Sequence, residues 1–158
     1  MTMNEELREL YQELIIDHGR HPRNYKKLDN FTHCQEGYNP LCGDRLILFI
    51  RVENDKVVDA SFEGVGCAIS VASASLMTEQ IKGKTLIQAK QLFLAFQQFV
   101  TEPEPLTPHT DNLGKLKVLG GVREFPSRIK CATLAWHTLK AGLEHHEPSE
   151  PSQVVTTE

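Results

Sequence analysis

This 158-residue sequence lacks several features, and each absence excludes a class of protein. No apolar run approaches the roughly 18 residues that a membrane span needs, so we expect no membrane segment. The formal net charge is −4, so we expect no large basic surface that would attract nucleic acid or anionic lipid. The first residues have neither the basic start nor the apolar stretch of a signal peptide. These absences predict a small, acidic, cytoplasmic protein.

Cysteine is also scarce, with four residues in the whole chain. In a reducing compartment such cysteines bind metal or act as redox thiols more often than they form disulfides. A chain of this length can bury a hydrophobic core without disulfide or metal staples. A metal ion would therefore be functional rather than a condition for folding.

The spacing of apolar residues predicts helices and one hairpin. In four segments apolar residues recur at steps of three and four, which is typical of helices with one buried face. These segments are 4–18, 69–83, 86–100 and 129–143. Apolar residues alternate over 45–52, and a second apolar run over 57–62 follows the turn residues Asn54 and Asp55. This pattern predicts two antiparallel strands joined by a tight turn.

Two segments show no such periodicity. Residues 101–112 hold three prolines and are predicted to form a loop. The end of the chain is polar and contains proline, which predicts disorder. The sequence therefore predicts one domain over residues 1–143 and a disordered tail over 144–158.

Three cysteines and one aspartate have the local chemistry of metal ligands. Cys42 and Asp44 flank Gly43, and side chains two residues apart can point to the same side of an extended or tightly turned segment. Cys67 and Cys131 are each predicted at the head of a helix, where free amides and the helix dipole favour a thiolate. The predicted hairpin returns the chain from Cys42 to Cys67 at one end of the sheet. The spacing of Cys131 leaves its membership of this site open.

If all four residues bind one divalent ion, three thiolates and a carboxylate favour zinc, with iron–sulfur chemistry as the other option. An oxygen ligand suggests a site whose ligands exchange. The residues alone also allow simpler interpretations. Cys67 and Cys131 fit buried apolar positions, and Asp44 fits a turn. Cys34 is interpreted as a packed or surface thiol, because nothing positions it as a ligand.

Three motifs in order resemble the U-type iron–sulfur cluster assembly family, which includes proteins like IscU and the N-terminal part of NifU. They are Asn39-Pro-Leu-Cys-Gly-Asp-Arg45, Gly66-Cys-Ala-Ile-Ser70 and Phe125-Pro-Ser-Arg-Ile-Lys-Cys-Ala-Thr-Leu-Ala-Trp136. Within this family, the motifs resemble more specifically those of the SufU branch. In the scaffold branch a histidine usually precedes the third cysteine, and Lys130 stands there in this chain. Leu41 departs from the pattern, since the family commonly has a small polar residue there.

The resemblance implies an α+β fold, in which a small antiparallel sheet of about three strands is packed by helices. It implies one zinc ion held by Cys42, Asp44, Cys67 and Cys131. It also implies a reaction in which Cys42 accepts sulfur from the persulfide of a pyridoxal-phosphate cysteine desulfurase similar to SufS. A histidine of the desulfurase would first replace Cys42 on the zinc. Cluster scaffold proteins are the implied downstream partners.

Two rival functions use the same residues. An iron–sulfur assembly scaffold would hold a transient cluster on Cys42, Asp44, Cys67 and Cys131. Lys130 argues against this function, because a protonated lysine cannot ligate a metal. A structural zinc domain that serves as an adaptor would leave Cys42 chemically inert. The metal found in protein purified without added iron separates the sulfurtransferase from the assembly scaffold.

Overall fold

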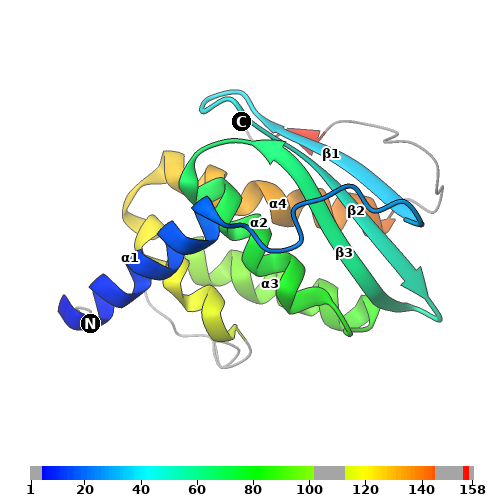
Figure 1. Ribbon diagram of the computed structural model, residues 1–158. Helices are drawn as coiled ribbons and strands as arrows, with labels where there is room; N and C mark the ends of the chain where they lie inside the picture. The colour runs from blue at the N-terminus through cyan, green and yellow to red at the C-terminus, as the bar shows by residue number, and fades with distance from the viewer. Residues whose placement is uncertain (1–4, 102–112, 145–154, 157–158) are drawn as a thin grey trace.

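The computed structural model describes residues 5–101, 113–144 and 155–156 (Figure 1). The helices and strands follow one another in a simple order. They are α1 (Glu5–Arg20), β1 (His33–Asn39), β2 (Asp44–Glu53), β3 (Lys56–Val65), α2 (Ala68–Ile81), α3 (Leu86–Thr101), the 3₁₀-helical segment η2 (Gly114–Glu124), α4 (Pro126–Glu144) and β4 (Val155–Thr156). Among these described residues, no helix is long and apolar enough to span a membrane.

One sheet with strand order β3-β2-β1-β4 lies against the helices. Strands β1, β2 and β3 are antiparallel neighbours, and the two-residue β4 pairs in parallel with β1. Figure 1 shows α4 passing behind the strands, and α4 contacts β1 and β2 while α2 contacts β3. The predicted α+β fold with a small antiparallel sheet is therefore confirmed. The predicted hairpin is β2 and β3, with Asn54 and Asp55 at positive φ in its turn.

The pattern of apolar residues does not predict β1. Its sequence, His-Cys-Gln-Glu-Gly-Tyr-Asn, has almost no apolar residue, yet Gln35, Gly37 and Asn39 face the buried side. A Cβ on Gly37 would collide with the hydroxyl of Thr138 on α4. The strand is thus buried by the close approach of α4 rather than by large side chains of its own.

The segment η2 was also not expected from the apolar spacing. Its buried residues include a series at every third position, which matches the three residues per turn of a 3₁₀ helix. The series is Leu116, Leu119 and Val122, and it continues from Leu113 directly before the segment, while Val118 and Gly120 are buried as well. A search for the 3.6-residue period of an α-helix misses this pattern.

The loop predicted over 101–112 lies outside the described residues except for Thr101, which ends α3. Most of the tail predicted to be disordered, residues 145–154 and 157–158, also lies outside them. Val155 and Thr156 differ from that prediction, because they pair with Gly37 and Tyr38 of β1. The domain limits of 1–143 and 144–158 otherwise stay predictions.

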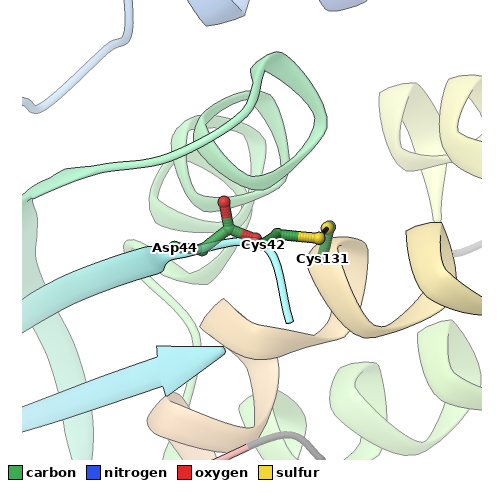
Figure 2. A group of neighbouring side chains, drawn as sticks. All are labelled: Cys42, Asp44 and Cys131. Atoms are coloured by element: carbon green, nitrogen blue, oxygen red, sulfur yellow. Dashed lines mark hydrogen bonds between the residues drawn. The ribbon is translucent and has the colours of Figure 1, made fainter. Parts of the chain in front are cut away.

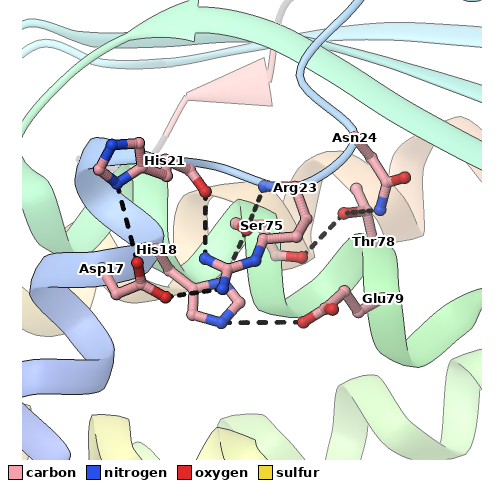
Figure 3. Close-up of polar contacts among 8 residues, drawn as sticks. All are labelled: Asp17, His18, His21, Arg23, Asn24, Ser75, Thr78 and Glu79. Carbon is pink, nitrogen blue, oxygen red and sulfur yellow. Dashed lines mark hydrogen bonds and ion pairs between the residues drawn. The ribbon is translucent and has the colours of Figure 1, made fainter.

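A partly buried polar network joins the end of α1 to α2 (Figure 3). His18 is fully buried, and its Nδ1 lies 2.7 Å from the hydroxyl of Ser75. The same hydroxyl accepts a hydrogen bond from the backbone N–H of Arg23, whose guanidinium pairs with Asp17 at 2.6 Å. The Nε2 of His18 lies 3.8 Å from a carboxylate oxygen of Glu79. The network fixes α1 against the helix that begins directly after Cys67.

We expect the protein to lose stability as the pH falls from 7.5 to 5.5. Burial, and then the charge of Arg23, lowers the pKa of His18 below its ordinary value. His137 is shifted in the same direction by burial. In the unfolded chain these histidines take up protons below about pH 6.5, whereas the folded protein resists. The stabilisation is therefore complete above that pH and is lost as the pH falls toward the folded pKa.

Urea unfolding of the wild type and His18→Gln at both pH values tests this expectation. The midpoint of the wild type should fall more on acidification than that of His18→Gln. The matched control is His21→Gln, because the His21 side chain is 79% exposed. If His18→Gln and the wild type lose the same amount of stability, burial of a neutral His18 is not the cause.

Candidate metal centre

Cys42 and Asp44 are brought together by the loop between β1 and β2. Gly43 has φ +70°, so the chain turns sharply between them in a conformation that favours glycine. Asp44 is the first residue of β2 and pairs with Asn39 across the ladder. Its side chain is fully buried, whereas Cys42 is exposed. The tight turn predicted around Gly43 is confirmed.

Cys131 joins these two residues from α4. Its Sγ lies 3.2 Å from the Sγ of Cys42, and one ligand atom each from Cys42, Asp44 and Cys131 lie within 4.8 Å of one another. Figure 2 shows the three side chains converging from the loop, β2 and α4. The tertiary structure thus places Cys131 beside the ligand pair, a point that its spacing left open.

The position of Cys131 within its helix differs from the prediction. The helix α4 begins at Pro126, since proline is well suited to the first helical position, so Cys131 lies in the second turn. Only 2% of the residue is exposed. Burial, followed by contacts with Cys42 and Asp44, raises the pKa of the Cys131 thiol instead of lowering it. This thiol donates a hydrogen bond to Cys42.

Cys67 lies at the head of α2, as predicted, and acts as its N-cap. Its Sγ accepts a hydrogen bond from the backbone N–H of Ser70 at 3.4 Å. Its own N–H donates to Oδ1 of Asp44 at 2.9 Å. A Cβ on the preceding Gly66 would lie 2.6 Å from the same oxygen. The exposed Cys67 therefore borders the site, but its Sγ is not one of the three ligand atoms that meet.

The donor set fits a zinc ion. Two thiols and a carboxylate converge at the distances expected around a single cation, and a third thiol lies at the border of the site. Zinc is commonly bound by cysteine thiolates with a fourth ligand that can exchange. A divalent cation deprotonates the thiols that bind it, which offsets the raised pKa of Cys131.

The buried side chain of Asn39 is a part of the site that the sequence interpretation missed. Its Nδ2 donates to Oδ2 of Asp44 at 3.2 Å and to Sγ of Cys131 at 3.6 Å. Its Oδ1 accepts a hydrogen bond from the backbone N–H of Leu41 at 3.3 Å. The asparagine-proline pair before the loop was the available signal, since asparagine commonly closes a turn by bonding the backbone two residues on.

Cys34 is not brought to the site. It lies on β1 five residues before Asn39, and side chains an odd number of residues apart point to opposite faces of a strand. The residue is half-buried, and burial raises the pKa of its thiol. Its chemistry and position are those of a packed thiol.

Comparisons with known proteins agree with this arrangement. Residues 10–132, which include the four predicted ligands, match the family described as the NifU-like N terminal domain. The zinc-dependent sulfurtransferase SufU of Bacillus subtilis (strain 168) is 42% identical over 147 residues, covering 93% of this chain and 98% of that protein. The iron–sulfur cluster assembly scaffold protein IscU of Streptococcus pyogenes serotype M1 is 39% identical, covering 87% of this chain and 85% of that protein.

A crystal structure of a proposed iron–sulfur cluster assembly scaffold protein for the SUF system of Fervidobacterium islandicum AW-1 is also similar. It superposes with a TM-score of 0.78 at 34% identity, covering 89% of this chain and 99% of that chain. The similarity therefore extends to the arrangement of the helices and strands that hold the candidate ligands.

Proposed function

Since the chain belongs to the NifU-like N-terminal domain family, we propose that it is a zinc-dependent sulfurtransferase of iron–sulfur cluster biogenesis in the cytoplasm. Its donor is the persulfide of a pyridoxal-phosphate cysteine desulfurase, and Cys42 is the acceptor. The unequal exposure of the converging ligands carries this proposal. Cys42 is exposed in a loop, whereas Asp44 and Cys131 are buried beside it. A partner protein can reach Cys42 without disturbing the other two.

Cys42, Asp44, Cys67 and Cys131 would hold the zinc ion. When bound, zinc keeps the thiols ionised at neutral pH and moderates their nucleophilicity. Asp44 receives hydrogen bonds from Asn39 and from the backbone of Cys67, so its carboxylate is oriented before any metal binds. The Sγ of the exposed Cys67 accepts only a weak hydrogen bond from the backbone N–H of Ser70, at 3.4 Å. It is therefore free to turn from that amide toward the other ligands.

The transfer itself is a thiol exchange at a sulfane sulfur. The thiolate of Cys42 attacks the terminal sulfur of the desulfurase persulfide and forms a new sulfur–sulfur bond. The bond between that sulfur and the desulfurase cysteine breaks, and its electron pair leaves with the desulfurase cysteine as a thiolate. The terminal sulfur keeps its proton, so Cys42 becomes a persulfide and no external oxidant or reductant is consumed.

Exposed apolar side chains next to the ligands support a protein as the partner. Leu41 is 64% exposed beside Cys42, Val65 is 69% exposed two residues before Cys67, and Phe125 is 45% exposed directly before α4. The guanidinium of Arg128 covers the Phe125 ring at 4.6 Å. Exposed apolar residues in the segments that carry a reactive group, with a cation beside one of them, are typical of protein interfaces. Cluster scaffold proteins are the proposed receivers of the sulfur.

Assembly scaffold is the second candidate function. The Streptococcus pyogenes relative has that name, at an identity close to that of the sulfurtransferase. The same ligands would then hold a transient cluster as cargo. Lys130, directly before Cys131, supplies no ligand while it is protonated, which favours the first candidate.

Purified wild-type protein tests the proposal. Prepared without added iron, it should contain about one zinc per chain and show no visible chromophore. After incubation with a cysteine desulfurase and cysteine, peptide mass mapping should place one extra sulfur on Cys42 and none on Cys34. A brown preparation rich in iron and sulfide would instead support the scaffold function, and a label on Cys34 would refute the role of Cys42.

A further inference from the structure

Asn39 connects the two buried ligands of the site, Asp44 and Cys131. Resting on the proposed function, we propose that Asn39 is a positioning residue whose side-chain amide holds Asp44 and Cys131 together while Cys42 leaves to accept sulfur. The proposal goes beyond the ligand set, because a residue that does not bind metal holds in place the two ligands that stay when Cys42 leaves.

The contacts of Asn39 use its donor and acceptor groups together. One Nδ2 amide group faces both Oδ2 of Asp44 at 3.2 Å and Sγ of Cys131 at 3.6 Å, and an amide nitrogen carries two hydrogens for two such partners. The carbonyl Oδ1 accepts from the N–H of Leu41, which fixes the plane of the amide. Asn39 is fully buried and is paired with Asp44 in the sheet, so its backbone is also held.

The ligands fall into a retained pair and an exposed pair. Asp44 is fully buried, bonded by Asn39 at Oδ2 and by the backbone of Cys67 at Oδ1. Cys131 is 2% exposed and belongs to a long helix that packs on β1. Cys42 and Cys67 are exposed, and Cys42 lies in the loop that connects β1 with β2. Departure of Cys42 therefore changes the exposed side and leaves the buried side intact.

The buried side needs a hydrogen-bond donor at the moment of exchange. The carboxylate of Asp44 and the Sγ of Cys131 lie within 4.8 Å of each other. A carboxylate and a thiolate this close repel each other, and the repulsion is strong where water is excluded. Hydrogen bonds to charged groups are stronger than those between neutral groups, so one amide bridging both anions counteracts that repulsion. The donor group of Asn39, rather than its carbonyl, is the part that carries this role.

A purely local role for Asn39 makes a different prediction. Its carbonyl closes a turn onto Leu41, and aspartate closes such turns as readily as asparagine. The variant Asn39→Asp keeps the size and the turn acceptor, but it replaces the donor group with a carboxylate oxygen. It therefore separates the bridging role from the turn role. Asn39→Ala removes both donor and acceptor without adding charge.

The first measurement is the rate at which zinc leaves the full-length wild type, Asn39→Asp and Asn39→Ala in excess chelator. Loss of a partner behind the metal ligands typically costs about 10–100-fold in metal affinity. We expect zinc to leave Asn39→Asp at least about tenfold faster than wild type, and no slower than it leaves Asn39→Ala. Circular dichroism of the metal-free proteins should show the same helical signal in all three.

Two results would overturn the proposal. If Asn39→Asp keeps zinc like the wild type while Asn39→Ala loses it, only the turn matters. If both variants keep zinc like the wild type, Asn39 has no role in the site. Should Asn39→Asp fail to fold, a wild-type rate in Asn39→Ala excludes the bridging role. A faster rate in Asn39→Ala supports bridging if the acceleration is larger in the Cys42→Ala background, and contradicts it if the acceleration is equal in both backgrounds.

The second measurement tests whether Asn39 acts on Asp44 and Cys131, the retained pair. In Cys42→Ala, Asp44 and Cys131 carry a larger share of the metal, so Asn39→Asp should accelerate zinc loss more in this background than in the wild type. Equal acceleration in both backgrounds would contradict a role in holding that pair. Zinc release needs no desulfurase, so it tests Asn39 even if sulfur mapping on Cys42 fails.

Discussion

Replacing Cys42 with alanine is expected to abolish sulfur acceptance while most of the bound zinc stays in place. The substitution removes the exposed nucleophile, but the proposed ligands Asp44, Cys67 and Cys131 remain, and three protein ligands suffice for a zinc site with an open position. The variant should not stimulate multiple turnover by a cysteine desulfurase. Zinc content by atomic emission and sulfide release from cysteine measure the two effects separately.

The matched control for this prediction is Cys34→Ala. Cys34 is half-buried on the far face of β1, so its removal should leave both zinc content and desulfurase stimulation at the wild-type level. If Cys42→Ala stimulates the desulfurase as well as the wild type does, Cys42 is not the sulfur acceptor. If it instead loses all zinc, Cys42 is a retained ligand and the division between buried and exposed ligands is wrong.

Replacing Cys131 with serine is expected to remove most of the metal. Serine keeps the size of the residue but supplies a hydroxyl in place of the thiolate proposed to bind zinc. It also leaves Asp44 and Asn39 without their sulfur partner on α4. The affinity should fall by more than the roughly 10–100-fold that loss of an outer partner costs. A competition titration with a zinc-binding dye measures it.

The fold should survive this loss of metal. Trp136, Phe96 and Leu134 are among the fully buried side chains of a core that does not depend on the site. Metal-free Cys131→Ser should therefore keep its helical circular dichroism signal. Full loss of that signal would show that the metal is a condition for folding.

Cys67→Ser is the informative companion to Cys131→Ser. Serine is a favourable N-cap, so this variant keeps the cap of α2 and changes only the ligand. A fall in zinc affinity without a fall in stability would make Cys67 the fourth ligand. Unchanged zinc affinity would limit the protein ligands to Cys42, Asp44 and Cys131.

The sequence predicted those elements whose pattern is complete within a short segment. Helix α3 and the hairpin of β2 and β3 bury their own apolar residues at regular spacing. This periodicity is sufficient to predict them. The strand β1 has no such pattern, since its burial depends on α4 lying against Gly37. The segment η2 has a regular pattern, but with a period of three.

The candidate site divides in the same way. The sequence by itself determined the turn of Cys42, Gly43 and Asp44 and the place of Cys67 at the head of a helix, because both depend on residues that are neighbours in the chain. Only the tertiary structure decided that Cys131 meets Cys42 and Asp44 and that Asn39 bridges Cys131 to Asp44. Those contacts join β1 and α4 across 92 residues of sequence, and a packed interface between two elements leaves no periodic signal in either one.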